Sequence, residues 1–196
     1  MNQVAVVILN FNGESFLKKF LPVLLQNTPP ETQIVVADNA STDSSIEILK
    51  KNFEKVKVIL LDKNYGFAEG YNQALKQVKA KYYVLLNSDV EVTENWLPPL
   101  VQLLEKENIV ACQPKILAFQ NKESFEYAGA AGGFIDRFGY PFCRGRVIDN
   151  LEIDNGQYND EIKVFWATGA CMVIKAELYH KVGGFDGDFF AHMEEI

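Results

Sequence analysis

The 196-residue sequence has only three cysteines, no excess of basic residues and no long apolar run. Cys112, Cys143 and Cys171 are an odd number at wide spacing, which fits a reducing compartment better than a disulfide framework. The net charge of -7 argues against a nucleic-acid-binding protein, because such proteins carry a basic patch. The apolar residues 4–9 have no basic segment before them and are too few to span a membrane. We therefore expect a cytoplasmic protein that associates at most peripherally with the inner face of the cytoplasmic membrane.

The composition is that of one ordinary globular domain. Hydrophobic residues make up 48% of the chain and charged residues 23%, so the chain is long and apolar enough to bury a core. The sequence ends at FFAHMEEI, inside what reads as the start of a helix, and we expect residues 1–196 to be a single domain truncated at its C-terminus. After about residue 109 the sequence becomes rich in glycine and aromatic residues. This change predicts a regular half over 1–108 and an irregular half over 109–196.

Strand-like and helix-like segments alternate in the first half. Four segments are apolar and β-prone: residues 4–9, 33–37, 56–61 and 82–86. Helical patterns, such as the one through Phe16, Phe20 and Leu24, lie between them. Strands that are apolar throughout and alternate with helices predict an α/β fold, with a mostly parallel sheet and helices on both faces. In the second half we expect strands over 110–117 and 163–174.

Polar side chains follow three of these predicted strands. Asn10 follows the first strand, Asp38 the second, and the tripeptide 87–89 (Asn-Ser-Asp) the fourth. Ligands bind at the carboxyl ends of the strands in open parallel sheets, so this placement favours a ligand site. Helix capping is the plainer role for such residues, but residues 41–43 already offer cap groups after Asp38. We therefore expect the Asp38 carboxylate to be free for a ligand.

Five segments carry a specific resemblance. VVILNFNG, VVADNASTD, NYGFAEGYN, LLNSDVEV and GACMVIKAELYHKVGGFDGDFFAHMEE stand in the order and approximate spacing of the family 2 glycosyltransferases. Among these, the chain most resembles the bacterial rhamnosyltransferase-like group that builds surface polysaccharides. The resemblance implies a GT-A fold and an inverting, metal-dependent transfer of a sugar. The donor would be a UDP- or dTDP-type nucleoside-diphosphate sugar, and the acceptor a saccharide or lipid-linked saccharide of the cell envelope.

The resemblance also implies roles for residues at matching positions. Residues 1–108 become the nucleotide-binding half and residues 109–196 the acceptor-side half. Asp38 would recognise the base. The implied nucleotide contacts are Asn10, Phe11, Asp38, Asn64, Gly66, Asn72, Asn87 and Ser88. The implied sugar and acceptor contacts are Trp166, Gly169 and Ala170, since glycine lets a ligand approach the backbone closely.

Asn87-Ser88-Asp89 stands at the D-x-D position of the family, which implies that Asp89 ligates Mg²⁺ or Mn²⁺. A carboxylate at a strand end suits such hard cations. The first member of the motif is Asn instead of Asp, so the ion would rest on one protein carboxylate and the diphosphate oxygens. This departure from the family pattern argues against tight metal binding.

The family's acidic pair reads Glu194-Glu195 in this sequence. Inversion requires a carboxylate that takes the proton of the acceptor hydroxyl, and the resemblance assigns this role to Glu195, with Glu194 in support. The turn at residues 183–186 is expected to bring the pair back over the strand ends. Without the resemblance, the two acids would read as the solvated start of a helix, where the helix dipole favours negative charge.

We also consider the arginines and the two histidines as candidate site residues. All three arginines, Arg137, Arg144 and Arg146, lie in one stretch, which fits either a phosphate clamp or an exposed basic loop. His180 reads as structural, whereas His192 fits either packing or metal binding.

Rival functional classes can be weighed on motifs. A dinucleotide dehydrogenase would need G-x-G-x-x-G after the first strand, where the chain has N-F-N-G. A receiver-like signalling domain would need an acidic pair at the same place. The remaining alternative to an enzyme is a non-catalytic GT-A-like nucleotide-binding protein.

Overall fold

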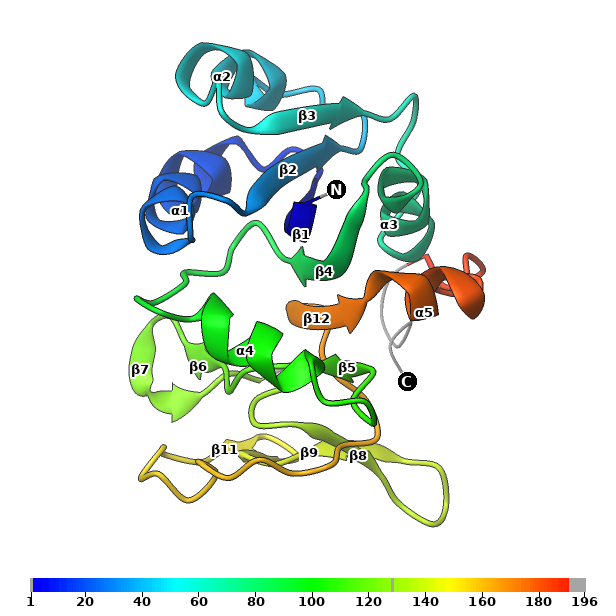
Figure 1. Ribbon diagram of the computed structural model, residues 1–196. Coiled ribbons are helices and arrows are strands. Elements are labelled where there is room, and N and C mark those ends of the chain that lie inside the picture. Colours follow the sequence, from blue (N-terminus) through cyan, green and yellow to red (C-terminus); the bar gives the residue numbers. More distant parts are fainter. Residues whose placement is uncertain (1, 128, 191–196) are drawn as a thin grey trace.

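The computed structural model describes residues 2–127 and 129–190 and is built around a six-stranded sheet with the order β3-β2-β1-β4-β12-β5 (Figure 1). β1 pairs in parallel with both β2 and β4, and β2 pairs in parallel with β3. β12 is antiparallel to both β4 and β5. These strands are β1 (Asn2–Asn10), β2 (Gln33–Asp38), β3 (Lys57–Leu60), β4 (Ala80–Leu86), β5 (Ala111–Cys112) and β12 (Cys171–Lys175). The predicted mostly parallel sheet is confirmed.

Helices cover both faces of this sheet, because its central strands are apolar on both sides. In β1, Val6 and Ile8 point to one face, and Ala5 and Val7 point to the other. The first face packs against α1, α2 and α4, and the second against α3 and α5. The helices are α1 (Glu14–Asn27), α2 (Ser45–Asn52), α3 (Ala68–Leu75), α4 (Leu97–Leu104) and α5 (Ala176–Lys181).

The chain between β5 and β12 forms two small antiparallel sheets. One joins β6 (Leu117–Ala118) to β7 (Asn121–Phe125). The other has the order β11-β10-β9-β8, with the strands β8 (Gly133–Ile135), β9 (Pro141–Cys143), β10 (Arg146–Val147) and β11 (Asn150–Leu151). Hence the predicted irregular half is short strands and turns.

The two strands predicted in the second half were too long. The run 110–117 is divided into β5 and β6 with Pro114 between them, since proline has no N–H to donate to a sheet. The run 163–174 forms a strand only from Cys171. Before it, Phe165 N–H donates to the carbonyl of Gly133 at 2.8 Å, and the Trp166 ring fills the space beside Gly133. Contacts between distant segments therefore override the local strand pattern.

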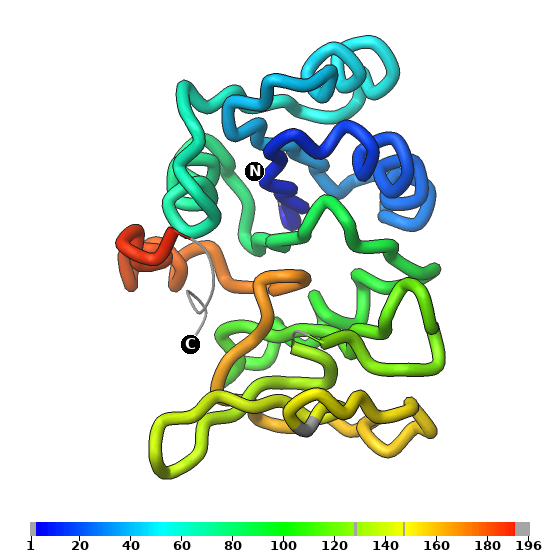
Figure 2. Tube along the Cα trace, turned by 180° about the vertical axis from the view of Figure 1, so that it is seen from behind, coloured from blue at the N-terminus to red at the C-terminus, as the bar shows by residue number. Residues whose placement is uncertain are grey.

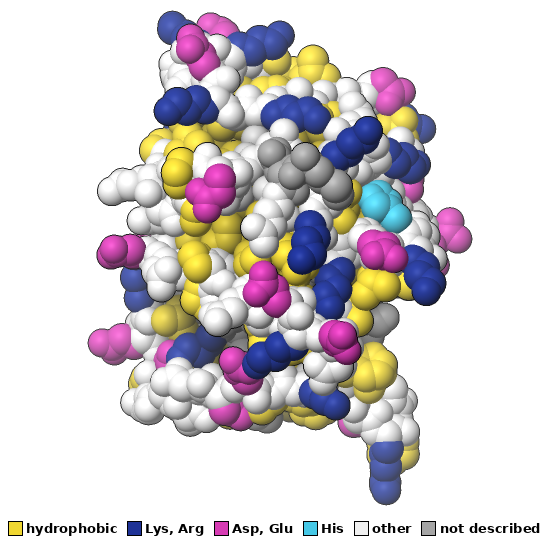
Figure 3. All heavy atoms as spheres, viewed as in Figure 1, with side chains coloured by type: hydrophobic (Ala, Val, Ile, Leu, Met, Phe, Trp, Pro, Cys, Tyr) yellow, Lys and Arg dark blue, Asp and Glu magenta, His cyan; other side chains and the backbone are white. Residues whose placement is uncertain are grey.

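Charges of both signs are interspersed over the face seen in Figure 3. Among residues 2–127 and 129–190, no helix is both long enough and apolar enough to cross a membrane.

Candidate functional site

The carboxyl ends of β1 and β2 are joined by a buried hydrogen-bond network. Nδ2 of Asn10 donates to Oδ2 of Asp38 at 2.9 Å and to Oγ of Ser41 at 3.1 Å. The N–H of Ser41 donates to Oδ1 of Asp38 at 2.9 Å. Asn10 is 0% exposed and Asp38 1% exposed. The Asp38 carboxylate, which the sequence predicted to be free for a ligand, thus also holds two loops together.

The loop after β1 continues this network toward the surface. Asn12 has a positive φ of 52°, which lets its Oδ1 accept the N–H of Thr42 at 2.8 Å. Its own N–H donates to Oγ of Ser41 at 2.9 Å. Phe11, in contrast, is 49% exposed and presents its ring beside the strand end. Of the predicted neighbours Asn10 and Phe11, the first is a buried structural link and the second is open to a ligand.

Asn39, which the sequence analysis missed, fastens a second loop to the end of β2. Its Nδ2 donates to Oδ1 of Asn64 at 2.9 Å and to the carbonyl of Gly66 at 3.0 Å, and its Oδ1 accepts the N–H of Tyr65 at 2.9 Å. Asn39 is 2% exposed. The available signal was a second amide directly after Asp38, at a strand end where buried polar groups need partners. Asn39 therefore holds Asn64 and Gly66, two of the predicted nucleotide contacts, beside the end of β2.

The end of β4 brings the tripeptide 87–89 to the same edge of the sheet. Asn87 and Ser88 are partly exposed and Asp89 is exposed. The N–H of Asn87 donates to the carbonyl of Ala170 at 3.0 Å, so the segment with Gly169 and Ala170 borders this end as well. A Cβ atom on Gly13 would lie 2.3 Å from Oδ1 of Asn10 and 3.6 Å from Oγ of Ser88, which places Ser88 near the end of β1.

The donor set at this edge fits a weakly held hard cation. No group of three His, Cys, Asp or Glu side chains that could hold a metal occurs within the described part of the chain. Asp89 supplies one exposed carboxylate, beside neutral oxygen donors. Mg²⁺ commonly takes one or two carboxylates and completes its shell with water and phosphate oxygens, so the residues present suffice for such an ion.

Two predicted site residues have their polar groups bound elsewhere. Nε1 of Trp166 donates to the carbonyl of Phe134 at 3.0 Å, and its ring lies against Gly133. The amide of Asn72 bonds to α5 and to the turn after it, as described below. Glu194, Glu195 and His192 lie outside the described residues. His180 is structural, as expected, since its Nε2 is 3.0 Å from the hydroxyl of Tyr83.

The arginine cluster does not form one clamp. Arg144 pairs with Asp160 at 3.0 Å and lies over the ring of Tyr158. Arg146 lies over the ring of Tyr127, and Arg137 over that of Phe138. Each guanidinium therefore has its own aromatic neighbour.

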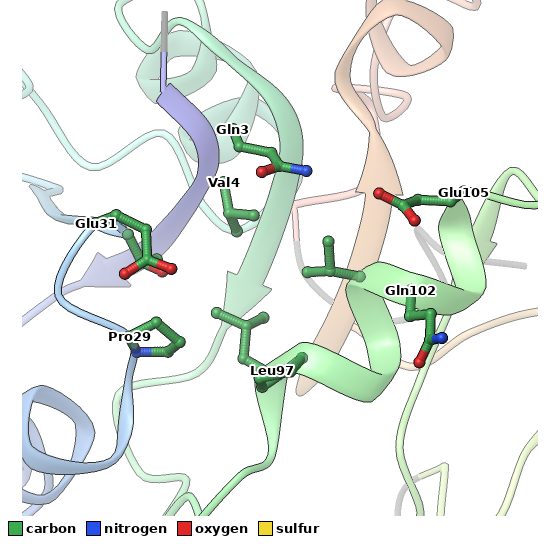
Figure 4. Close-up of a pocket in the computed structure, with 10 residues that line it drawn as sticks. Gln3, Val4, Pro29, Glu31, Leu97, Gln102 and Glu105 are labelled. Atoms are coloured by element: carbon green, nitrogen blue, oxygen red, sulfur yellow. The ribbon is translucent and has the colours of Figure 1, made fainter.

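Two hollows of the described chain lie away from these strand ends. One of about 530 Å³ is lined by Gln3 and Val4 at the start of β1, by Pro29 and Glu31, and by Leu97 of α4 (Figure 4). It is at the amino end of β1, opposite Asn10. Another of about 720 Å³ lies among α4, β5 and residues 158–167, and Trp166 lines it. Neither hollow includes Asn10, Asp38 or residues 87–89.

Comparison with known proteins assigns the family. The profile described as Glycosyl transferase family 2 matches residues 5–183. The chain belongs to the family 2 glycosyltransferases. It is 24% identical over 193 residues to the O-antigen biosynthesis protein RfbC of Myxococcus xanthus, covering 95% of this chain and 15% of that protein. It is 21% identical over 225 residues to the N-acetylglucosaminyl-diphospho-decaprenol L-rhamnosyltransferase of Mycobacterium tuberculosis, covering 97% and 67% of the two chains.

Solved structures confirm the predicted GT-A fold. GalNAc-T7 with UDP, GalNAc and Mn²⁺ superposes with a TM-score of 0.71 at 19% identity, covering 100% of this chain and 39% of that one. Residues 1–349 of S. aureus TarS with UDP superpose with a TM-score of 0.67 at 18% identity, covering 98% and 52%. The family 2 chain described here thus spans about half of these solved structures or less.

Asp43 links the start of α1 to the start of α2, because its carboxylate accepts the N–H groups of Glu14 and Ser45. We expect this link to stabilise the protein while Asp43 is ionised. Burial opposes its charge, but hydrogen bonds from Ser45 and from the N–H of Glu14 outweigh burial and hold its pKa below the ordinary value. A carboxyl group whose pKa is lowered by folding stabilises the protein fully at pH values above its ordinary pKa. This stabilisation is lost as the pH falls through the lowered pKa. Asp43→Asn should lower the free energy of unfolding at pH 7 by roughly 1–3 kcal/mol.

Urea unfolding of wild type and Asp43→Asn, repeated from pH 7 down to pH 3, measures this effect. The difference between the two proteins should shrink toward the acid end of the series. Glu47→Gln, on the exposed first turn of α2, is the matched control. A difference that stays constant over the whole range contradicts an electrostatic role for Asp43.

Proposed function

We propose that this chain is the catalytic GT-A domain of an inverting glycosyltransferase that uses a nucleoside-diphosphate sugar. The observation that carries the proposal is the convergence of Asn10, Asp38, residues 87–89 and Ala170 on the carboxyl edge of one parallel sheet. This is the edge where open α/β sheets bind ligands. The family match over residues 5–183 supports the chemistry.

For the donor we propose a UDP- or dTDP-type sugar, and for the acceptor a saccharide or lipid-linked saccharide of the cell envelope. UDP and UDP-GlcNAc are bound in the similar TarS structures, and GDP-Man in that of a Pyrobaculum calidifontis mannosyltransferase. The M. tuberculosis relative is named for a decaprenol-linked acceptor and for rhamnosyl transfer. Because of this likeness, we propose that this chain transfers rhamnose and that its acceptor is linked to a lipid.

Each residue at the edge would have a distinct task. The exposed ring of Phe11 would stack on the base, which Asp38 would recognise. Residues 64–66, held by Asn39, would line the nucleotide, with Asn87 and Ser88 beside the diphosphate. Asp89 would hold Mg²⁺ or Mn²⁺, which supplies positive charge to the leaving diphosphate.

The remaining roles concern the sugar and its acceptor. Trp166, Gly169 and Ala170 would border them, the last two directly beside the end of β4. Glu195 would take the proton of the acceptor hydroxyl while the diphosphate leaves from the opposite face of the sugar.

The metal assignment predicts that Asp89→Ala loses the metal dependence of nucleotide binding. In wild type, Mn²⁺ should tighten UDP or dTDP binding, because an ion held by Asp89 would supply positive charge to the diphosphate. Calorimetry with and without EDTA measures both proteins, with exposed Glu94→Gln as the control. If Asp89→Ala binds nucleotide with wild-type affinity and wild-type metal dependence, the ion is held elsewhere.

The base-recognition assignment predicts that Asp38→Ala weakens UDP binding by roughly ten- to a hundredfold, since a hydrogen bond to a buried charge contributes about 1.5–3 kcal/mol. The base must reach a carboxylate that also holds Asn10 and Ser41, so a structural effect has to be separated. Ribose 5-diphosphate, which lacks the base, separates the two. Equal losses for UDP and for this ligand would rule out base recognition and leave Asp38 as a loop anchor.

The catalytic assignment predicts that Glu195→Gln lowers the rate of transfer by about 10²–10⁴ and leaves donor binding nearly unchanged. Single-turnover transfer and calorimetry test this, with Glu194→Gln as the neighbouring variant. A collapse in Glu194→Gln alone would exchange the two roles. If wild type binds nucleoside diphosphates but transfers no sugar from any donor of a panel, the chain is instead a nucleotide-binding protein.

A further inference from the structure

Residues 183–190, which we call the return segment, lie beside α3 in both views of the chain (Figures 1 and 2). The segment follows α5 and ends four residues before Glu194 in the sequence. In the sequence the segment is thus followed closely by the pair that the proposed function makes catalytic.

Asn72 of α3 holds the return segment with its whole amide. Its Nδ2 donates to the carbonyl of Phe185 at 2.9 Å and to Oε2 of Glu69 at 3.0 Å. Its Oδ1 accepts the N–H of Phe185 at 3.0 Å and the hydroxyl of Tyr179 at 2.6 Å. An Asn amide offers two protons and two lone pairs, and here all four have protein partners.

The backbone of the return segment is shaped for this contact. Gly184 has a φ of 85°, a conformation that side-chain-bearing residues rarely adopt. A Cβ atom there would lie 2.3 Å from Oδ1 of Asn72. The ring of Phe185 then packs edge-on against Tyr179, with ring centroids 5.6 Å apart.

The far end of the return segment is held by the loop before α3. The N–H of Phe67 donates to the carbonyl of Phe190 at 2.6 Å. The adjacent Gly66 is itself bound by Asn39 at the end of β2. Asn72 and Phe67 thus fix the two ends of the segment to the nucleotide-binding half.

We propose that Asn72 is a positioning residue that fixes the return segment, and not a nucleotide ligand as its motif position implies. A saturated, 9%-exposed amide would have to break a protein hydrogen bond before it could bind a nucleotide. Its influence on transfer, which rests on the proposed function, passes through Phe185 and the segment that leads to the acidic pair. A small displacement of a catalytic group is costly, because about 1 Å of misplacement can lower a rate a hundredfold.

The test compares Asn72→Ala with Gln73→Ala. Gln73 is the next residue of α3 and its side chain also donates to Glu69, but among the described residues it has no hydrogen bond to the return segment. Hydrogen exchange followed by mass spectrometry reports the segment, calorimetry reports UDP affinity, and steady-state kinetics reports transfer. In Asn72→Ala we expect exchange in residues 183–190 to rise about tenfold or more while β1 and β4 keep their protection. UDP affinity should stay within about twofold and kcat should fall about tenfold or more.

Tyr179→Phe is a milder second variant, since it removes one of the four hydrogen bonds and keeps the ring contact with Phe185. We expect it to lie between wild type and Asn72→Ala in both exchange and kcat. A tenfold loss of UDP affinity with unchanged exchange would make Asn72 a nucleotide ligand and overturn the proposal. Faster exchange throughout the sheet in Asn72→Ala and Tyr179→Phe would also overturn the proposal, because it would indicate general destabilisation. A wild type without transfer activity would overturn the proposed function instead, and the exchange measurement would still decide whether Asn72 holds the segment.

Discussion

The parallel pairing of β1 with β2 on one side and β4 on the other is the constraint on which the rest of the structure depends. Strands in this position are covered on both faces, so side chains such as Val6 and Val7 are fully buried on opposite sides. Polar groups are then restricted to the strand ends. Because the three strands run in the same direction, their ends bring Asn10, Asp38 and residues 87–89 to one edge. The direction of the strands therefore determines where the site lies, and the individual residues at the strand ends determine what it can bind.

Beyond the strand ends, asparagine amides replace the regular pairing of backbone groups. Asn12 joins the β1 loop to Thr42, Asn39 joins the end of β2 to the loop before α3, and Asn72 joins α3 to the return segment. The amides of Asn39 and Asn72 both donate and accept, so each satisfies a backbone N–H and a backbone C=O that have no strand beside them, while Oδ1 of Asn12 accepts a backbone N–H. These loops are thereby fixed without additional charge, and segments far apart in the sequence are joined into one surface.

The sequence was sufficient for the part of the fold that depends on local pattern. The strands through Val6, Val35 and Val84 were predictable because each is apolar throughout and bounded by turn residues. The bounds of the strands in the second half were not predictable, because its backbone is set by pairs such as Trp166 with Gly133 and Gln113 with Thr168. The site divides in the same way. The place of Asp38 follows from its strand, but the direction of its carboxylate depends on Ser41 and Asn10. The task of Asn72 depends on Phe185, 113 residues away, which no local motif records.

The charge balance at the carboxyl edge gives the proposed ion a physical role. The network that holds the strand ends consists of amides, hydroxyls and the buried carboxylate of Asp38, and Asp89 adds an exposed carboxylate after β4. The three arginines lie against aromatic rings in the second half, one of them paired with Asp160. A nucleoside diphosphate would therefore bring further negative charge to an edge that carries the carboxylates of Asp38 and Asp89. A divalent cation between Asp89 and the diphosphate would reverse this repulsion, and it would do so most where charge accumulates as the sugar leaves.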